Sequence, residues 1–374
     1  MAGVYIHIPF CKRLCAYCDF YKSVRLSYLE EVVAAMHREL SERRGYLRDQ
    51  RIETLYFGGG TPSLLSVEQL AGLKRRVEDL FDCSHLGEVT LEANPDDLTR
   101  PYLEGLRKAG FNRLSIGVQS FDDEELRWMN RRHTAQRAEE AVREARAAGF
   151  ENLTLDLIFG VPGFGEEVLR RNLERVLALE PEHISAYHLT IEPETALGRK
   201  EARGELCAVE ESISEREYAL VHETLTRAGY DHYEISNYAR PGFRARHNSA
   251  YWQGREYLGI GPAAHSFDGR SRRWSLDTVE SYASGGEFRF EQELLTERDR
   301  LNEYLMTHLR TAEGISFREM GEQFGPEAVA RIEKEAEPLL LQRMLSSTPE
   351  GLKIPAERFL LSDHLIGMLF EPGE

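Results

Sequence analysis

The sequence predicts an α/β protein whose parallel strands form a partial, TIM-like (β/α)6 barrel. Six short β-rich runs recur along the first half of the chain, and a helical pattern follows each of them. Strands that alternate with helices in this way form a parallel sheet with the helices outside it. Six units are too few for a closed eight-stranded barrel but enough for an open one. A doubly wound sheet would give a similar pattern and stays an alternative.

Each predicted strand is an apolar run that ends in glycine, proline, amide or carboxylate residues. They are the runs at 4–10, 54–60, 89–95, 113–120, 152–163 and 183–192. Between them, stretches such as 27–47 and 122–150 carry apolar residues at helical spacing. In parallel α/β folds the carboxyl edge of the sheet carries the chemistry, so these strand ends are where we expect the site.

The pattern of alternating strands and helices ends near residue 229, which indicates further domains in a chain of 374 residues. We therefore expect a barrel at 1–229 and an extension rich in Tyr, Gly and His at 230–290. The residues at 291–374 predict a mostly helical, winged-helix-like domain.

Composition limits the possible partners and the compartment. The chain has 47 basic and 63 acidic residues and a formal charge of −16, which disfavours binding to nucleic acid or anionic membranes. No apolar run approaches the ~20 residues of a membrane span, and the amino terminus does not resemble a signal peptide. We therefore expect a cytoplasmic protein without transmembrane segments, in which cysteines are available for metal or catalysis.

Three of the five cysteines, Cys11, Cys15 and Cys18, lie within eight positions directly after the first predicted strand. With His7 they could supply the four ligands of a structural zinc ion. They could also hold an iron–sulfur cubane, in which case three thiolates leave one iron open to an outside ligand.

The C-x3-C-x2-C spacing of these cysteines resembles the signature of the radical S-adenosylmethionine superfamily. The resemblance implies a [4Fe-4S] cluster whose fourth iron is chelated by the amino and carboxylate groups of S-adenosylmethionine. It also implies that the glycine-rich run meets the methionine ammonium, that Arg131 clamps the carboxylate and that Asp156 accepts from the ribose. The cofactor-binding residues implied in this way are Tyr5, Tyr17, Gly59, Gly60, Thr61, Glu92, Gln119, Arg131 and Asp156.

Within that superfamily the chain resembles the HemW family of heme chaperones, through "YIHIPFC", "GGGTP", "RLSIGVQSF", "LDLIFGVPG" and "YEISNYARPG". The related oxygen-independent coproporphyrinogen III oxidase has a fourth cysteine where this chain has Phe20, and a longer segment before its first motif. Because of these two departures, we expect a heme chaperone and keep oxidative decarboxylation of a porphyrinogen as the alternative function.

The segment "RHNSAYW" at 246–252 matches the H-N-x-x-Y-W motif that is associated with heme binding in that family. The resemblance implies His247 as an iron ligand, with His265 as the competing ligand, and aromatic faces for the macrocycle. Arg240, Arg244 and Arg246 could meet the heme propionates. It also implies delivery of heme to acceptor proteins such as membrane respiratory subunits. The heme-binding residues implied are His247, Asn248, Tyr251 and Trp252.

Overall fold

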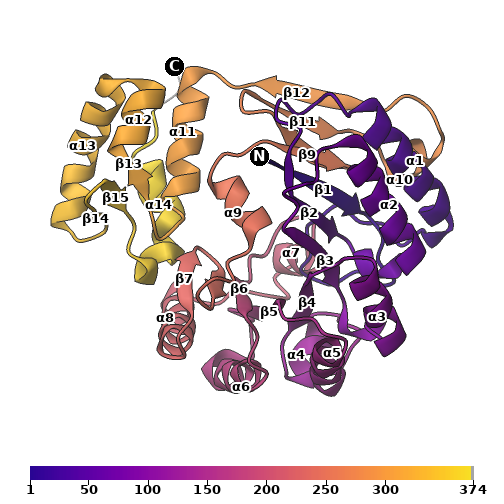
Figure 1. Ribbon diagram of the computed structural model, residues 1–374. Helices are drawn as coiled ribbons and strands as arrows, with labels where there is room; N and C mark the ends of the chain where they lie inside the picture. Colours follow the sequence, from indigo (N-terminus) through magenta and orange to yellow (C-terminus); the bar gives the residue numbers. More distant parts are fainter. Residues whose placement is uncertain (372–374) are drawn as a thin grey trace.

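Six parallel strands form the centre of the fold in a computed structural model that describes residues 1–371 (Figure 1). They are β1 (Ala2–Ile8), β2 (Ile52–Gly59), β3 (Glu88–Ala93), β4 (Arg113–Gln119), β5 (Leu153–Phe159) and β6 (His183–His188). Each overlaps a predicted run, and neighbours in the sheet follow chain order. A doubly wound sheet would reverse its strand order at a switch point. The predicted partial (β/α)6 barrel is therefore confirmed.

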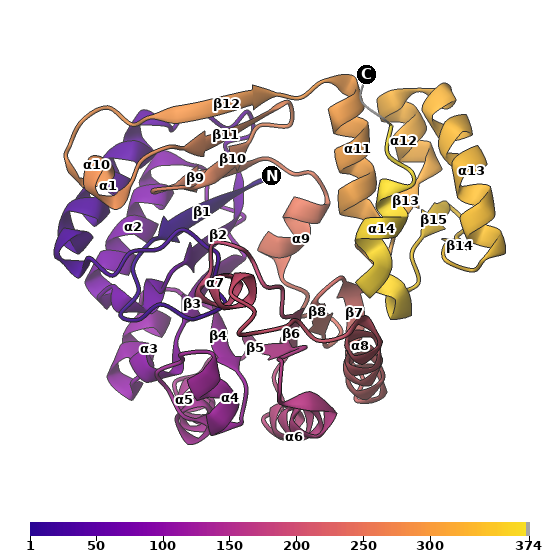
Figure 2. The same cartoon turned by 180° about the vertical axis from the view of Figure 1, so that it is seen from behind.

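Helices cover the outer face of this curved sheet (Figures 1 and 2). They are α1 (Leu29–Glu42), α2 (Val67–Leu80), α3 (Arg100–Lys108), α4 (Asp123–Trp128), α5 (Ala135–Ala147), α6 (Gly165–Ala178), α7 (Ala196–Ala202) and α8 (Glu211–Arg227), of which α7 lies nearer the mouth of the barrel. Local signals set their ends, as at Ser66, whose side chain forms a capping box with Gln69 at the start of α2. The same helix then buries Leu70, Leu73 and Val77 against the sheet.

The extension adds strands to both edges of the barrel sheet. Its elements are β7 (Asp231–Glu234), β8 (Asn237–Ala239), α9 (Arg246–Trp252), β9 (Tyr257–Ile260), β10 (His265–Phe267), β11 (Ser271–Ser275), α10 (Val279–Ala283) and β12 (Phe290–Leu294). β8 pairs antiparallel with β6, whereas β9 pairs parallel with β1 at the opposite edge. Between these two pairings the chain crosses the concave side of the sheet, where α9 contacts both β2 and α11.

A smaller lobe follows the extension and is mostly helical, as predicted. It contains α11 (Glu297–His308), β13 (Ile315–Ser316), α12 (Phe317–Phe324), α13 (Pro326–Leu341), β14 (Ser346–Ser347), β15 (Gly351–Lys353) and α14 (Ser362–Gly367). Its three short strands form a separate antiparallel sheet. The expected boundary at residue 291 falls inside β12, which still pairs with β11. Within residues 1–371, no helix has the length and apolar character needed to cross a bilayer.

Candidate functional site

A pocket of about 380 Å³ opens at the carboxyl ends of the parallel strands. Its walls come from the loop after β1 and from the ends of β2 to β6, which is the edge where parallel α/β folds place their sites. The predicted cluster and cofactor residues that line it are Cys11, Cys15, Tyr17, Cys18, Gly59, Gly60, Thr61, Glu92, Gln119, Arg131 and Asp156. Residues far apart in the sequence are thus gathered around one cavity.

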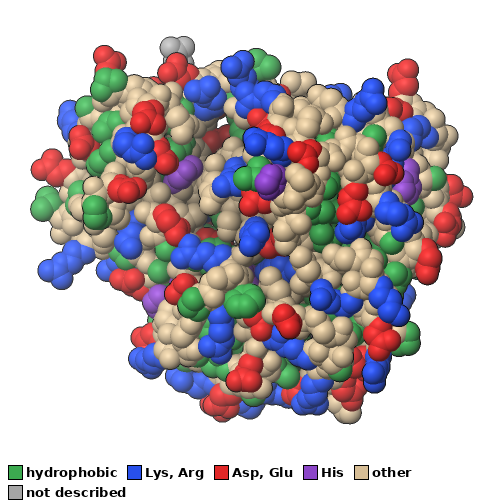
Figure 3. Space-filling model, in the orientation of Figure 1, with side chains coloured by type: hydrophobic (Ala, Val, Ile, Leu, Met, Phe, Trp, Pro, Cys, Tyr) green, Lys and Arg blue, Asp and Glu red, His purple; other side chains and the backbone are tan. Residues whose placement is uncertain are grey.

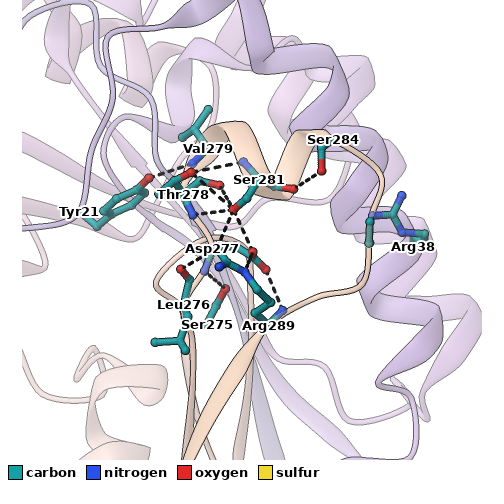
Figure 4. Close-up of polar contacts among 11 residues, drawn as sticks. Tyr21, Arg38, Ser275, Leu276, Asp277, Thr278, Val279, Ser281, Ser284 and Arg289 are labelled. Atoms are coloured by element: carbon teal, nitrogen blue, oxygen red, sulfur yellow. Dashed lines mark hydrogen bonds and ion pairs between the residues drawn. The ribbon is translucent and has the colours of Figure 1, made fainter.

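The loop that carries the three cysteines folds back on itself. The N–H of Cys11 donates to the carbonyl of Ser23 (2.9 Å), and the Lys22 ammonium donates to two carbonyls within the loop. At its end, the Tyr21 hydroxyl accepts from the N–H of Val279 at the start of α10 (2.8 Å; Figure 4). The loop is therefore held by its own backbone and by the extension.

The start of α10 is itself fixed by Asp277, which is buried. This carboxylate accepts from the Ser281 hydroxyl (2.9 Å) and from the backbone N–H and Nε of Arg289 (3.0 Å each; Figure 4). Charge-assisted bonds of this kind are stronger than neutral ones. The extension thus offers the cysteine loop a rigid support.

Two of the thiols have polar partners at the pocket wall. The Thr61 hydroxyl donates to Sγ of Cys11 (3.4 Å), and the Arg131 guanidinium donates to Sγ of Cys15 (3.3 Å). Burial raises the pKa of the Cys11 and Cys18 thiols. Cys11 and Cys18 are therefore protonated without metal and would release protons when iron binds. Phe20, which also borders the pocket, is 69% exposed, so its ring leaves the cavity open to water on that side.

His7, the fourth ligand in the zinc alternative, is already engaged. Its Nδ1 lies 3.0 Å from the Tyr5 hydroxyl and its Nε2 lies 3.0 Å from the Tyr21 carbonyl oxygen. Burial lowers the pKa of His7 to about 4. Among residues 1–371, no three His, Cys, Asp or Glu side chains are arranged to hold a single metal ion. In a [4Fe-4S] cubane each thiolate binds a different iron atom, so the cysteines do not have to converge on one point. The three cysteines that line this pocket are compatible with such a cluster.

Gly59, the last residue of β2, and Gly60 after it both lie where a larger side chain would collide with neighbouring atoms. Gly59 has a φ of 108°, and a Cβ there would lie 2.6 Å from the His7 ring. A Cβ on Gly60 would lie 2.7 Å from the carbonyl oxygen of Phe10, at the root of the cysteine loop. The glycine-rich run therefore lets this strand end pack directly against the loop.

Arg131 reaches the pocket because a helix is interrupted. The stretch at 122–150 carries apolar residues at helical spacing, but α4 ends at Trp128 and α5 begins at Ala135. Between them Asn130 takes a left-handed φ of 61°, and its side chain donates to the carbonyl of Leu14 in the cysteine loop (2.7 Å). The guanidinium of Arg131 then bridges the Asn94 side chain and the Gly117 carbonyl, at 2.6 Å each.

Two carboxyl groups face the cavity from β3 and β5, on either side of β4. Glu92 accepts from the Tyr56 hydroxyl (2.7 Å) and from the N–H of Gly59 (3.1 Å), and Asp156 lies near the Ser115 hydroxyl (3.3 Å). Burial raises the pKa of Glu92 to about 7 and that of Asp156 to about 6. Both groups are thus poised to exchange a proton when a ligand with hydroxyl or ammonium donors enters.

Glu92→Gln is expected to stabilise the ligand-free protein at pH 8 by about 1–2 kcal/mol and to have little effect at pH 4. The folded pKa lies above the ordinary value, so the contribution of Glu92 to stability is present below that value and is lost as the pH rises through about 7. A Gln side chain avoids this loss, since the Tyr56 hydroxyl can accept from its amide. Thermal unfolding at both pH values tests this, with exposed Glu124→Gln as the control. Equal midpoints for the variant and the wild type at pH 8 would contradict it.

Tyr5 is the one predicted cofactor residue that does not line the pocket among the described residues. It stacks on Tyr56 inside the barrel, with ring centroids 6.0 Å apart. His247 continues this stack, 5.0 Å from Tyr56. Its Nδ1 lies 2.8 Å from the Thr54 hydroxyl and its Nε2 lies 2.9 Å from the Tyr251 hydroxyl. Iron ligation by His247 therefore stays a prediction that requires one of these two contacts to open.

Of the other heme-motif residues, Tyr251 lies one turn further along α9 than His247, and its hydroxyl contacts that histidine. Tyr251 and Trp252 line a second cleft, between the barrel and the smaller lobe, and Asn248 is half-buried on the same helix. The three arginines proposed for propionates are not among the residues that line this cleft, and Arg244 forms an ion pair with Glu313. His265 is exposed and stacks on Trp274, with centroids 5.9 Å apart.

Several pocket residues were missed by the sequence analysis. The signal for two of them was present, since Asn94 directly follows a strand end and Ser115 shares the face of its strand with Gly117. No comparable signal marks those that the loop and the last strand contribute. The missed lining residues are Arg13, Asp19, Lys22, Pro62, Ala93, Asn94, Ser115, Gly117, Ile158, Tyr187, His188, Leu189 and Thr190.

Comparison with known proteins agrees with this geometry. Residues 5–176 match the family model of the radical SAM superfamily, and residues 295–361 match that of the HemN C-terminal domain. Fold and site together define a radical SAM protein, and this class carries a [4Fe-4S] cluster and S-adenosylmethionine as cofactors. The chain belongs to the HemW family.

Two relatives named heme chaperone HemW establish this membership. The protein of Lactococcus lactis is 32% identical over 97% of this chain and 96% of its own length. That of Mycobacterium tuberculosis H37Rv is 40% identical over 75% of this chain and 73% of its own. Among solved structures, coproporphyrinogen III oxidase (HemN) from Escherichia coli has a TM-score of 0.83 at 23% identity, over 99% of this chain and 90% of that one, which shows the shared fold.

Proposed function

We propose that this protein is a heme chaperone that acts in the cytoplasm and passes heme to acceptor proteins such as membrane respiratory subunits. The observation that carries the proposal is the combination of full-length similarity to HemW with an aromatic cleft beside the H-N-x-x-Y-W helix. A reducing compartment suits three thiols kept free for iron.

Cys11, Cys15 and Cys18 would hold the [4Fe-4S] cluster, and the donor set of the pocket fits this role. Cysteine thiols are the ligands that iron–sulfur clusters take, and the three at this wall are buried (Cys11) or half-buried (Cys15, Cys18). When bound, the cluster supplies an electron that can cleave a carbon–sulfur bond of the sulfonium cofactor. The protein's own residues place and shield the two groups.

The pocket also fits S-adenosylmethionine. Nε of Arg131 is buried without a hydrogen-bond partner among the described residues, and a carboxylate would satisfy it. Glu92 and Asp156 can accept from ammonium or ribose hydroxyl groups. The cofactor site would be completed by Gly59, Gly60, Thr61, Tyr17 and Gln119. Tyr5 would contribute indirectly, because its ring stacks on Tyr56.

Anaerobic reconstitution followed by titration with ferric heme tests the function. We expect about four irons per chain and a brown colour. We also expect a shifted Soret band that saturates at one heme per chain, measured with and without S-adenosylmethionine. A reconstituted protein that binds no heme saturably would remove the chaperone function.

The alternative, oxidative decarboxylation of coproporphyrinogen III, is separated by a second assay. Reconstituted protein with a reductant, S-adenosylmethionine and coproporphyrinogen III should release no carbon dioxide if the chain is a chaperone. Formation of protoporphyrinogen at a steady rate would favour the oxidase instead.

A further inference from the structure

The second cleft separates the barrel from the smaller lobe and has a volume of about 670 Å³. Figures 1 and 2 show α9 between the sheet and α11, and Figure 3 shows the surface hollowed between the two lobes. Ligand pockets for drug-sized or cofactor-sized molecules fall in the range of ~300–1,000 Å³. The cleft is therefore large enough for a flat macrocycle.

Aromatic side chains line both walls of the cleft. On the barrel side Tyr251 meets Tyr257 edge to face, with ring centroids 4.6 Å apart. On the lobe side Tyr304 meets Phe324 at 5.6 Å. Flat apolar faces on two opposite walls suit a planar, largely apolar ligand. The aromatic lining residues are Tyr251, Trp252, Tyr257, Phe267, Tyr304 and Phe324.

His308, at the carboxyl end of α11, is the histidine on these walls. Its Nδ1 lies 2.9 Å from the carbonyl oxygen of Tyr304 and 3.1 Å from the hydroxyl of Thr307. The carbonyl can only accept, so Nδ1 carries the proton and Nε2 carries a lone pair. Nε2 has no hydrogen-bond partner within residues 1–371. Metal-ligating histidines show this arrangement, with the second ring nitrogen donating to a carbonyl.

His308 and His247 differ in whether a ring nitrogen is available to bind iron. Both ring nitrogens of His247 are engaged, and its side chain is only 2% exposed. His308 is half-buried on the cleft wall, and burial lowers its pKa, which keeps the imidazole neutral at pH 7. A neutral imidazole with an open nitrogen is the form that binds iron.

The cleft also offers a cation for an acidic substituent. Arg255 and Arg272 line it but are paired, with Glu53 at 2.8 Å and Glu303 at 3.0 Å. Arg300 lies over the Phe324 ring at 5.7 Å and forms no ion pair within the described residues. Its guanidinium can take a carboxylate in a bidentate contact. Glu303 and Glu319 are the acidic residues of the lining.

We propose that this cleft is the heme site, that Nε2 of His308 is an axial ligand of the heme iron and that Arg300 binds a propionate. The inference rests on the proposed function, because it names where and by which groups the chain holds heme. The H-N-x-x-Y-W helix then contributes Tyr251 and Trp252 as one wall, while the iron is bound from the opposite lobe.

The test is titration of the full-length reconstituted protein with ferric heme, followed by visible and electron paramagnetic resonance spectra. His308→Ala should weaken heme binding by about tenfold or more and change the spectrum of the bound iron. His308→Gly with added imidazole should restore the wild-type spectrum, which a merely structural role would not allow. His364→Ala, at an exposed histidine of the same lobe, is the control and should change nothing.

Arg300→Ala tests the propionate contact separately. It should weaken binding by about tenfold without changing the spectrum, whereas Arg298→Ala two residues away should bind as the wild type does. Wild-type affinity and spectrum in a folded His308→Ala variant would overturn the assignment and leave the chaperone function standing. Absence of saturable binding in the wild type would overturn the function itself.

Discussion

Cys15→Ala is expected to lower the iron content of anaerobically reconstituted protein from about four atoms per chain to near zero. A cubane with three protein ligands has no spare thiolate, so the loss of one leaves two corners without protein. The Arg131 guanidinium, which now donates to Sγ of Cys15, would also lose an acceptor in a partly buried site. Iron and sulfide analysis with the visible spectrum measures the effect.

The chain supplies matched controls for this experiment. Cys83 is half-buried in the segment after α2, Cys207 is exposed, and neither lines the pocket. Cys83→Ala and Cys207→Ala should therefore keep the full iron content. A Cys15→Ala protein that still holds a complete cluster would exclude Cys15 as a ligand.

Glu39→Ala is expected to destabilise the fold by about 3–5 kcal/mol, because it leaves a buried charge without its partner. Glu39 in α1 is fully buried and accepts from Arg43 (2.9 Å) and from the N–H of Gly261 after β9 (2.9 Å). Arg43 in turn donates to the carbonyl of Gly259 (2.7 Å) and to Ser266 (2.8 Å). The network fastens the extension to the first helix of the barrel.

Denaturant unfolding measures this change, and Glu42→Ala is the control. Glu42 lies one turn further along α1, is 53% exposed at its side chain and pairs with Arg38 at 3.6 Å. Removal of an exposed pair of this kind should cost no more than about 0.5 kcal/mol. Equal stabilities of the two variants would show that the Glu39 network does not hold the extension in place.

The gathering of the predicted site residues at one pocket depends on local signals in the sequence. The cysteine spacing is a local feature, and Glu92 and Asp156 each lie near the end of an apolar run. Parallel strands bring their carboxyl ends to one edge, so the gathering of these groups in one pocket follows from the strand pattern alone.

The features that could not be predicted depend on contacts between distant segments. The break at Asn130 needs a left-handed residue within a helical pattern, and β9 pairs with β1 across some 250 positions of chain. The engagement of both His247 nitrogens also depends on tertiary packing, since Thr54 lies on β2. The second cleft lies between two lobes whose relative placement leaves no trace in composition or periodicity.

The short helix α9 acts as a partition. Toward the barrel, His247 stacks on Tyr56, whose hydroxyl donates to Glu92 at the pocket of the cysteines. One turn further along α9, Tyr251, whose hydroxyl contacts His247, lines the cleft between the lobes together with Trp252. A porphyrin in that cleft would therefore enter and leave between the two lobes, without passing through the pocket of the cysteines. It would stay insulated by packed rings from the electrons and reactive species at the barrel mouth.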